Sequence, residues 1–238
     1  MLAPSDRLRG GGGGGWLVLI GGGEFSFGET SEADAAWLAK VADGPIAFLP
    51  TASASADYAT HFSTYVSDTL EREPLTVPIY RGRDARRGKN LERIGRAGAV
   101  YFGGGISDTL LEVLTDSPAQ EALEAKVKSG GVLVGIAAAA QAFGGRCRSL
   151  TGRDELPGFS WLPRTAVEVN FDPAHDRRVR QLLEAPGMRW GLGLPSGSAV
   201  LFGSGEEIET VGPVFLLDGA DDDWKLLHSE PDRQISQN

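Results

Sequence analysis

Short, wholly apolar runs recur along the chain, and amphipathic segments lie between them. Such runs, bounded by glycine or polar residues, are typical of strands buried on both faces of a parallel sheet. The intervening segments repeat apolar residues at helical spacing, as at Ala33, Trp37 and Val41. The alternation predicts right-handed β-α-β crossovers and a three-layer α/β/α domain with a doubly wound, mostly parallel sheet. The predicted strands are 16–20, 46–49, 77–80, 99–102 and 132–134.

After residue 145 the pattern loosens. We interpret this part as a continuation of the same domain, in which antiparallel strands extend the sheet. The expected elements are strands at 166–171, 199–202, 214–217 and 224–227, and one helix at 176–184. Earlier in the chain, Ser117-Pro118-Ala119-Gln120 has the form of a capping box with proline at the first helical position, which predicts a helix start.

Glycine is unusually abundant, with 33 of 238 residues, and three glycine runs stand out. The first run, at 10–15, lies in a segment without apolar periodicity, and six glycines in a row are costly to order. We therefore expect residues 1–15 to be a flexible leader, 16–229 a single α/β domain and 230–238 a frayed tail.

The net charge of −9 disfavours general binding to nucleic acids or anionic membranes, because phosphate contacts need a basic surface. The single cysteine, Cys147, cannot form an intramolecular disulfide. No apolar run approaches the ~18 residues of a membrane span, and the first 15 residues lack the apolar core of a secretory signal. We expect a cytoplasmic protein, and whether it forms a homodimer stays open.

Ligands of open α/β sheets bind at the carboxyl ends of the strands, so the loops after the strands are the candidate sites. The Gly21–Glu24 loop departs from a dinucleotide fingerprint and is better explained as a tight turn. Pro50–Ser53 follows the second strand and could face a substrate or simply cap a helix. Three glycines at 103–105 after a strand favour a functional loop, because their N–H groups can approach an anion or oxyanion.

The segment 132–145 turns from an apolar strand into a helix of small residues, which is the architecture of a nucleophile elbow. In G-x-nucleophile-x-G the nucleophile position is Ala137, which has no atom that can attack a carbonyl. The sequence therefore predicts that the strand-to-helix turn is present but that its nucleophile is missing.

Taken in order, these motifs resemble the serine peptidases that include dipeptidase E and cyanophycinase, relatives of the class I glutamine amidotransferases with a flavodoxin-like sheet. The resemblance runs from about residue 16 to residue 227. It rests on G-G-G-E at 21–24, P-T-A-S at 50–53, Y-F-G-G-G at 101–105, G-I-A-A-A-A at 135–140, N-F at 170–171, and G-L-G-L through G-S-A at 191–199.

The resemblance implies that the catalytic serine of the family falls on Ala137 and its histidine on Asn170, which cannot act as a base at neutral pH. The elbow glycine of the family falls on Ala139. What survives is the implied oxyanion apparatus of Gly104, Gly105 and the amide of Ala138. Loss of the triad as a unit favours a naturally degenerate member over an engineered trap.

Other side chains could rebuild a site only in part. Ser107 in the glycine loop and Ser53 after the second strand are the candidate ligand-binding serines. His61, His175 and Cys147 are better explained as solvated or structural residues. No cluster has metal-ligand spacing, so we expect neither a metal nor another cofactor.

Residues 81–96 hold seven of the 23 basic side chains. A solvated loop and helix face is the favoured interpretation of this segment, and a local anion-binding edge is the alternative.

The sequence thus predicts a peptidase-like protein that has lost hydrolytic activity and keeps a pocket for a small acidic or peptide-like ligand, or for a partner. The alternative is an active hydrolase of acidic dipeptides or cyanophycin-like peptides that uses a relocated nucleophile such as Ser107.

Overall fold

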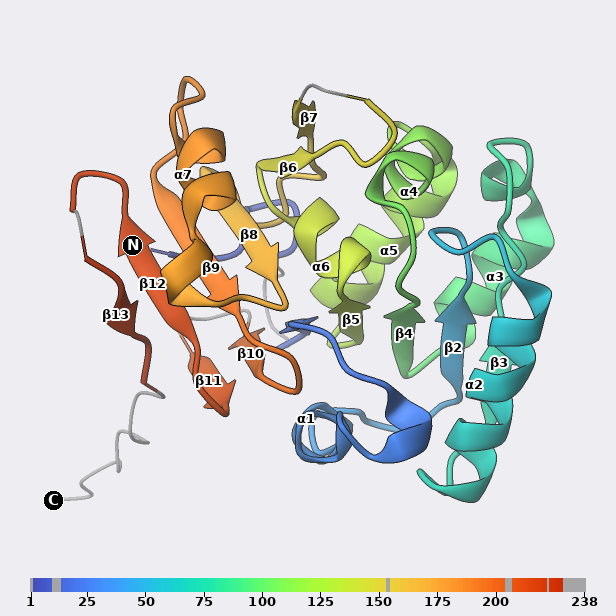
Figure 1. Ribbon diagram of the computed structural model, residues 1–238. Coiled ribbons are helices and arrows are strands. Elements are labelled where there is room, and N and C mark those ends of the chain that lie inside the picture. Colours follow the sequence, from blue (N-terminus) through green and yellow to red (C-terminus); the bar gives the residue numbers. More distant parts are fainter. Residues whose placement is uncertain (1, 10–13, 153–154, 204–206, 222, 229–238) are drawn as a thin grey trace, which may run out of the picture.

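The computed structural model describes residues 2–9, 14–152, 155–203, 207–221 and 223–228 (Figure 1). A seven-stranded sheet forms its centre, in the order β11-β10-β1-β5-β4-β2-β3. The strands β1 to β5 are parallel to one another, whereas β10 pairs antiparallel with β1 and β11 antiparallel with β10. The bounds are β1 (Trp16–Ile20), β2 (Ile46–Leu49), β3 (Pro74–Thr76), β4 (Ala99–Phe102), β5 (Val132–Ile136), β10 (Ala199–Gly203) and β11 (Ile208–Val211).

Helices cover both faces of this sheet, as the sequence predicted. On one face lie α1 (Ser31–Leu38) and α2 (Ala56–Asp68), with the short η1 (Phe25–Phe27). The helices of the other face are α3 (Gly88–Arg96), α4 (Ser107–Leu114), α5 (Pro118–Lys128) and α6 (Ala138–Phe143), and η2 (Asp84–Arg86) precedes α3.

The alternation along β1 shows how the sequence builds these layers. Leu17 and Leu19 belong to the core under α3 to α6, and Val18 and Ile20 belong to the core under α1 and α2. All four are essentially inaccessible to solvent, because neighbouring side chains of a strand point to opposite faces. A wholly apolar strand is therefore what a sheet covered on both faces requires.

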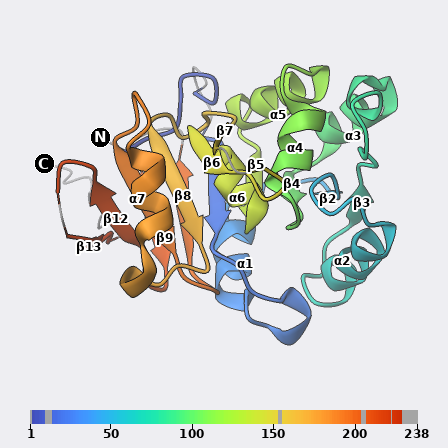
Figure 2. The same ribbon diagram turned by 45° about the horizontal axis from the view of Figure 1, so that its top comes forward.

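The second half of the chain forms a further sheet of six strands, in the order β13-β12-β9-β8-β6-β7. The expectation of one continuously extended sheet is correct only for β10 and β11. Figure 2 shows α6 between this second sheet and α4, with α7 (Arg177–Leu183) on the outer side of β8 and β9. The strands are β6 (Arg146–Arg148), β7 (Glu155–Pro157), β8 (Thr165–Val169), β9 (Trp190–Leu194), β12 (Phe215–Asp218) and β13 (Lys225–Leu226), and η3 (Pro173–His175) precedes α7.

The predicted strand at 77–80 is wrong, and β3 lies three residues earlier at Pro74–Thr76. Val77 and Ile79 are fully buried, which explains the apolar run. Pro78 has no N–H to join a ladder, and the N–H of Ile79 turns back to the carbonyl of Val77 at 2.8 Å. The chain therefore leaves the sheet here while its side chains stay in the core.

The amino-terminal segment also differs from the flexible leader that we expected. Leu2 and Leu8 are 5% and 1% exposed and belong to the main core, and the Ser5 N–H donates to the Trp161 carbonyl at 2.8 Å. Two buried leucines offset the entropy cost of ordering the segment. Residues 10–13 of the glycine run and the predicted tail at 230–238 lie outside the described residues.

The predicted start of α5 is confirmed. The Ser117 hydroxyl accepts a hydrogen bond from the Gln120 N–H at 3.2 Å, and Pro118 is the first helical residue. The Gln120 side chain accepts instead from the N–H of Asp116, so the reciprocal half of the box is displaced by one residue.

Candidate functional site

The turn from β5 into α6 holds Ala137 in a strained conformation, with φ of 51° and ψ of −115°. L residues rarely adopt this conformation, and it is the kind of strain that nucleophile elbows store. The Ala137 N–H donates to the Ile20 carbonyl at the end of β1, at 3.1 Å, and its carbonyl accepts from Gln141. Gly135 permits the sharp turn, because a Cβ there would lie 2.6 Å from the Phe143 ring.

The glycine loop after β4 approaches this turn closely. A Cβ built on Gly104 would lie 3.7 Å from the Ala137 Cβ. Gly105 has φ of +147°, and a Cβ there would lie 2.4 Å from the backbone of Ala52. The Ile106 N–H donates to the Ala52 carbonyl at 2.9 Å, so the loop is fastened to the segment that follows β2. Gly105 is thus required by the fold, whereas Gly104 faces the elbow.

Among the described residues, no acceptor is found for two N–H groups at this junction. Ala138 is the first residue of α6, and the first N–H of a helix has no acceptor within the helix. In the described part of the chain, no acceptor is found for the Gly105 N–H either. These are the donors that an anion or a carbonyl oxygen could use at a helix N-terminus.

Asn170 lies directly after β8 with φ of 49°, and its N–H donates to the Gly21 carbonyl at 2.8 Å. Ala137 and Asn170 are therefore attached to consecutive peptide units, at Ile20 and Gly21. Gly22 makes room for the Asn170 side chain, because a Cβ at Gly22 would lie 2.3 Å from its Oδ1 atom. The structure thus brings together the positions at which the resemblance places serine and histidine.

The hydroxyl groups of both candidate serines donate hydrogen bonds to backbone carbonyls. Ser107 is fully buried, and its hydroxyl donates to the carbonyl of Ala138 at 3.1 Å. It lies beside the elbow, but a nucleophile must reach a substrate, and the buried Ser107 hydroxyl is not accessible to one. The Ser53 hydroxyl donates to the Pro50 carbonyl at 3.1 Å and accepts from the Ser55 N–H. Both contacts are those of turn and packing residues.

The histidines and the cysteine do not join these groups. His175 is exposed and contacts Asp172 at 2.8 Å through Nδ1. Cys147 is buried, and burial, with the nearby charge of Asp108, raises the pKa of its thiol to about 12, so the thiol is unreactive at neutral pH. His61 lines a separate pocket on α2.

Two cavities contain residues that contact the elbow or the glycine loop, namely Gln141 and Tyr58. One, of about 750 Å³, contains Asn170 and Gln141 and is bordered by Arg148, Arg178 and Glu168. Glu168 is half-buried, and its Oε2 atom has no hydrogen-bond partner in the part of the chain that the structure describes. Burial raises the pKa of this carboxyl, and the charges of Arg178 and Arg148 act in the opposite direction.

The larger cavity, of about 1020 Å³, lies between η1 and α2 and is lined by Glu24, Phe25, Phe27, Tyr58 and His61, among others. No motif in the sequence singles out Tyr58. Burial raises the pKa of the Tyr58 hydroxyl, although a hydrogen bond from the Gly104 backbone acts to lower it. Through this hydrogen bond, Tyr58 connects the cavity to the glycine loop. The only signal in the sequence was the helical spacing of Tyr58, Phe62 and Tyr65.

A mostly parallel α/β sheet, a strained strand-to-helix turn and an adjoining glycine loop define the class of hydrolases that use a nucleophile elbow. Within this class, the sequence matches the family described as Peptidase family S51 over residues 17–208, and the chain belongs to this family.

Individual relatives agree with this assignment. The chain is similar to a cyanophycinase of Geminocystis herdmanii (strain PCC 6308), with 28% identity over 196 residues, covering 74% of this chain and 70% of the relative. The fold is similar to that of a peptidase from an acI-B1 actinobacterium (TM-score 0.73, 21% identity, 91% of this chain and 95% of the other). It is also similar to a putative peptidase E protein from Listeria monocytogenes EGD-e (TM-score 0.62, 14% identity, 83% and 98%).

Two further observations concern the described residues only. None of their helices is both long and apolar enough to cross a membrane. Nor do three or more His, Cys, Asp or Glu side chains lie together in an arrangement that could hold a metal ion.

Proposed function

We propose that this protein is a member of the S51 peptidase family without hydrolytic activity, and that it binds a small acidic or peptide-like ligand at the retained elbow. The observation that carries the proposal is Ala137 itself. Its backbone has the strained conformation of an elbow, and its methyl group stands where the attacking oxygen is required.

The surroundings of Ala137 support the loss of activity. Asn170 occupies the position of the general base, and an amide cannot take up a proton at neutral pH. Ser107 is the nearest hydroxyl that the sequence offered as a substitute, and it is buried and donates to the Ala138 carbonyl. The structure therefore gives no reason to favour a relocated serine.

The surroundings also support binding. The N–H groups of Gly105 and Ala138 can donate to a carbonyl or carboxylate oxygen. The 750 Å³ cavity beside Asn170 has the volume of a small-molecule site, and Arg148 and Arg178 supply guanidinium groups for a carboxylate. A short peptide with an acidic group matches these donors.

A turnover assay tests the loss of activity. The protein is incubated with Asp-Leu, a β-Asp-Arg dipeptide and cyanophycin, and free amino acids or dipeptides are quantified. We expect no release above a blank without protein. Release that disappears in Ser107→Ala would refute the proposal, and so would release that survives this substitution.

Calorimetry with the same dipeptides and with N-acetyl-aspartate tests binding. We expect saturable binding that is weakened at least about fivefold in Gly104→Ala, because the added methyl group narrows the space beside Ala137. Gly95→Ala is the matched control, since a Cβ at Gly95 meets nothing within 4 Å. Absence of saturable binding, or equal loss in both variants, would contradict a ligand site at the elbow.

A further inference from the structure

A further pocket, distinct from the two cavities described above, lies on the other side of the segment that follows β2. Its volume is about 570 Å³, and it is lined by Ala54, Ala56, Pro78, Tyr80, Arg81, Arg83, Asp84 and Arg87. Ala52 and Ser53, in the same segment, contact Gly105 of the glycine loop. The pocket is thus at the carboxyl edge of the sheet, where α/β proteins bind ligands, but it is separate from the elbow.

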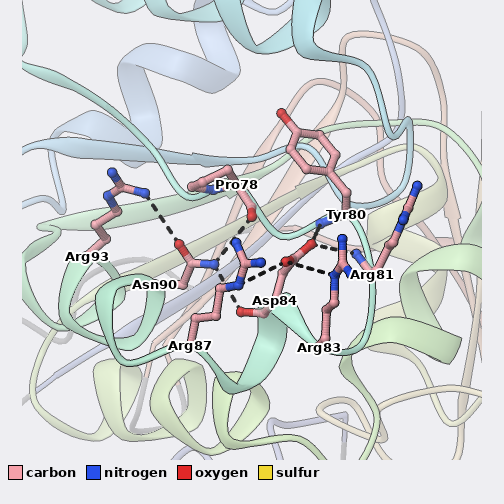
Figure 3. Close-up of polar contacts among 8 residues, drawn as sticks. All are labelled: Pro78, Tyr80, Arg81, Arg83, Asp84, Arg87, Asn90 and Arg93. Atoms are coloured by element: carbon pink, nitrogen blue, oxygen red, sulfur yellow. Dashed lines mark hydrogen bonds and ion pairs between the residues drawn. The ribbon is translucent and has the colours of Figure 1, made fainter.

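The arginine-containing segment 80–90 beside this pocket is ordered by hydrogen bonds to two buried polar side chains. Asp84 is buried, and its carboxylate accepts hydrogen bonds from the N–H groups of Tyr80 and Arg81 at 3.3 and 3.2 Å. Asn90 is also buried and donates to the carbonyls of Pro78 and Asp84. Figure 3 shows these contacts converging at the base of the segment, which fixes the backbone from which the arginine side chains project.

The charges of the lining do not cancel. Arg87 contacts Asp84 at 3.3 Å and Arg83 does so at 4.0 Å, and both side chains remain more than half exposed. In Figure 3 the Arg81 side chain points away from Asp84, and no described residue forms a hydrogen bond or ion pair with its guanidinium group. Three arginines and one aspartate thus line the pocket, in a protein whose net charge is −9.

A fixed excess of positive charge around a concave surface attracts anions, and it does so locally even in an acidic protein. Arginine is suited to this because its planar group binds carboxylate or phosphate with two hydrogen bonds. The guanidinium groups come from three positions along the rim rather than from one point. A ligand with two or more negatively charged groups can therefore contact more than one of these arginines at once.

We propose that the Arg81–Arg83–Arg87 pocket is a binding site for a small ligand that carries two or more negatively charged groups, either carboxylates or phosphates. The site is independent of the elbow and of the proposed ligand there. Most residues of the segment 81–96 are exposed, as the favoured interpretation of the sequence expected, and the proposal adds to this face the local anion-binding edge given there as the alternative.

Calorimetry at low salt with the full chain tests the proposal, using the peptide Asp-Asp-Asp, inorganic tripolyphosphate and the neutral peptide Asn-Asn-Asn. The test variant is Arg81→Gln/Arg83→Gln, which leaves the closer Arg87–Asp84 pair in place. The matched control is Arg86→Gln/Lys89→Gln, which removes the same charge from the same segment at exposed residues outside the pocket. Thermal unfolding confirms that each variant folds, and Arg81→Gln alone serves if the double variant does not.

We expect at least one of the two anions to bind, with no binding of Asn-Asn-Asn. The dissociation constant should rise about tenfold in the test variant and less than about threefold in the control, since direct ion pairs lose more than distant charges. The anion that binds identifies whether carboxylates or phosphates are preferred. Binding of neither anion, or equal losses in both double variants, would overturn the proposal, whereas the effect of Gly104→Ala reports on the elbow alone.

Discussion

Gly104 and Gly105 are adjacent in sequence but should respond in opposite ways to replacement by alanine. At Gly105 the backbone has φ of +147°, which L residues rarely adopt, and a Cβ would overlap the Ala52 backbone at 2.4 Å. Strain of this kind costs about 1–3 kcal/mol and overpacking a further 1–3 kcal/mol. Because the obstacle is backbone rather than a flexible side chain, relaxation cannot remove it without moving the segment that follows β2. We expect Gly105→Ala to lower the free energy of unfolding by about 3–5 kcal/mol.

At Gly104 the nearest atoms to a new Cβ are the Ala137 Cβ at 3.7 Å and the Ile136 carbonyl oxygen at 3.9 Å, both ordinary contacts. Its φ lies outside the range that L residues avoid. A compatible Gly→Ala change stabilises a protein by up to about 1 kcal/mol, because the unfolded chain loses freedom. Gly104→Ala should therefore be neutral or slightly stabilising while it obstructs the elbow.

Urea unfolding measures both effects, followed by the fluorescence of tryptophans such as Trp37 and Trp161, which are fully buried. The m-values should agree with that of the unmodified protein, so that the midpoints report stability. If Gly105→Ala unfolds within about 1 kcal/mol of the unmodified protein, or if both variants lose equal stability, the division of the loop into a structural and a site-facing glycine is wrong.

Three further predictions concern stability. Ser117→Ala should cost about 1 kcal/mol in urea unfolding, because the N–H of Gln120 loses its cap, and Ser129→Ala at the exposed C-cap of the same helix should cost less. Leu8→Ala should cost about 2–4 kcal/mol if the amino-terminal segment packs as described, and an unchanged midpoint would restore the flexible-leader interpretation. For Asp108, burial acts to raise the pKa, but hydrogen bonds from Ser149, Thr151 and the Leu150 N–H outweigh it and lower the pKa. The stability from Asp108 is thus full above its ordinary pKa near 3.8 and is lost as pH falls further, so Asp108→Asn should flatten the acid limb of stability against pH.

The sequence predicted most of the main sheet because its strands are apolar on both faces, as in β1 and β4, and only a covered parallel sheet accommodates that pattern. It failed at 77–80, where burial and strand pairing separate because of Pro78. The second sheet was underestimated for a different reason. β6 and β7 are three residues long and only partly buried, so they carry almost no periodicity.

Site residues could be predicted from the sequence where the backbone conformation requires a small residue. They could not be predicted where side chains from elements far apart in the sequence come together. Gly105 and Ala137 are marked by the glycine loop and by the strand-to-helix turn, both of which are local in sequence. Tyr58 carries no such mark, and Arg81 is marked only as one of the seven basic residues in the segment 81–96. Their positions depend on how α2 and the segment after β3 pack around the loop that follows β2, which is a tertiary property.

The strained turn at Ala137 has a cause that does not involve its side chain. Its N–H is held by the Ile20 carbonyl of β1, and its carbonyl is held by the Gln141 N–H of α6. Hydrogen bonds on both sides therefore determine the conformation, which persists at a cost of about 1–3 kcal/mol because its surroundings fix it. Replacing a serine by alanine at such a position removes the attacking oxygen and leaves the turn, the first N–H of α6 and the glycine loop in place. Loss of the attacking oxygen therefore does not entail loss of the backbone N–H groups on which the proposed ligand binding depends.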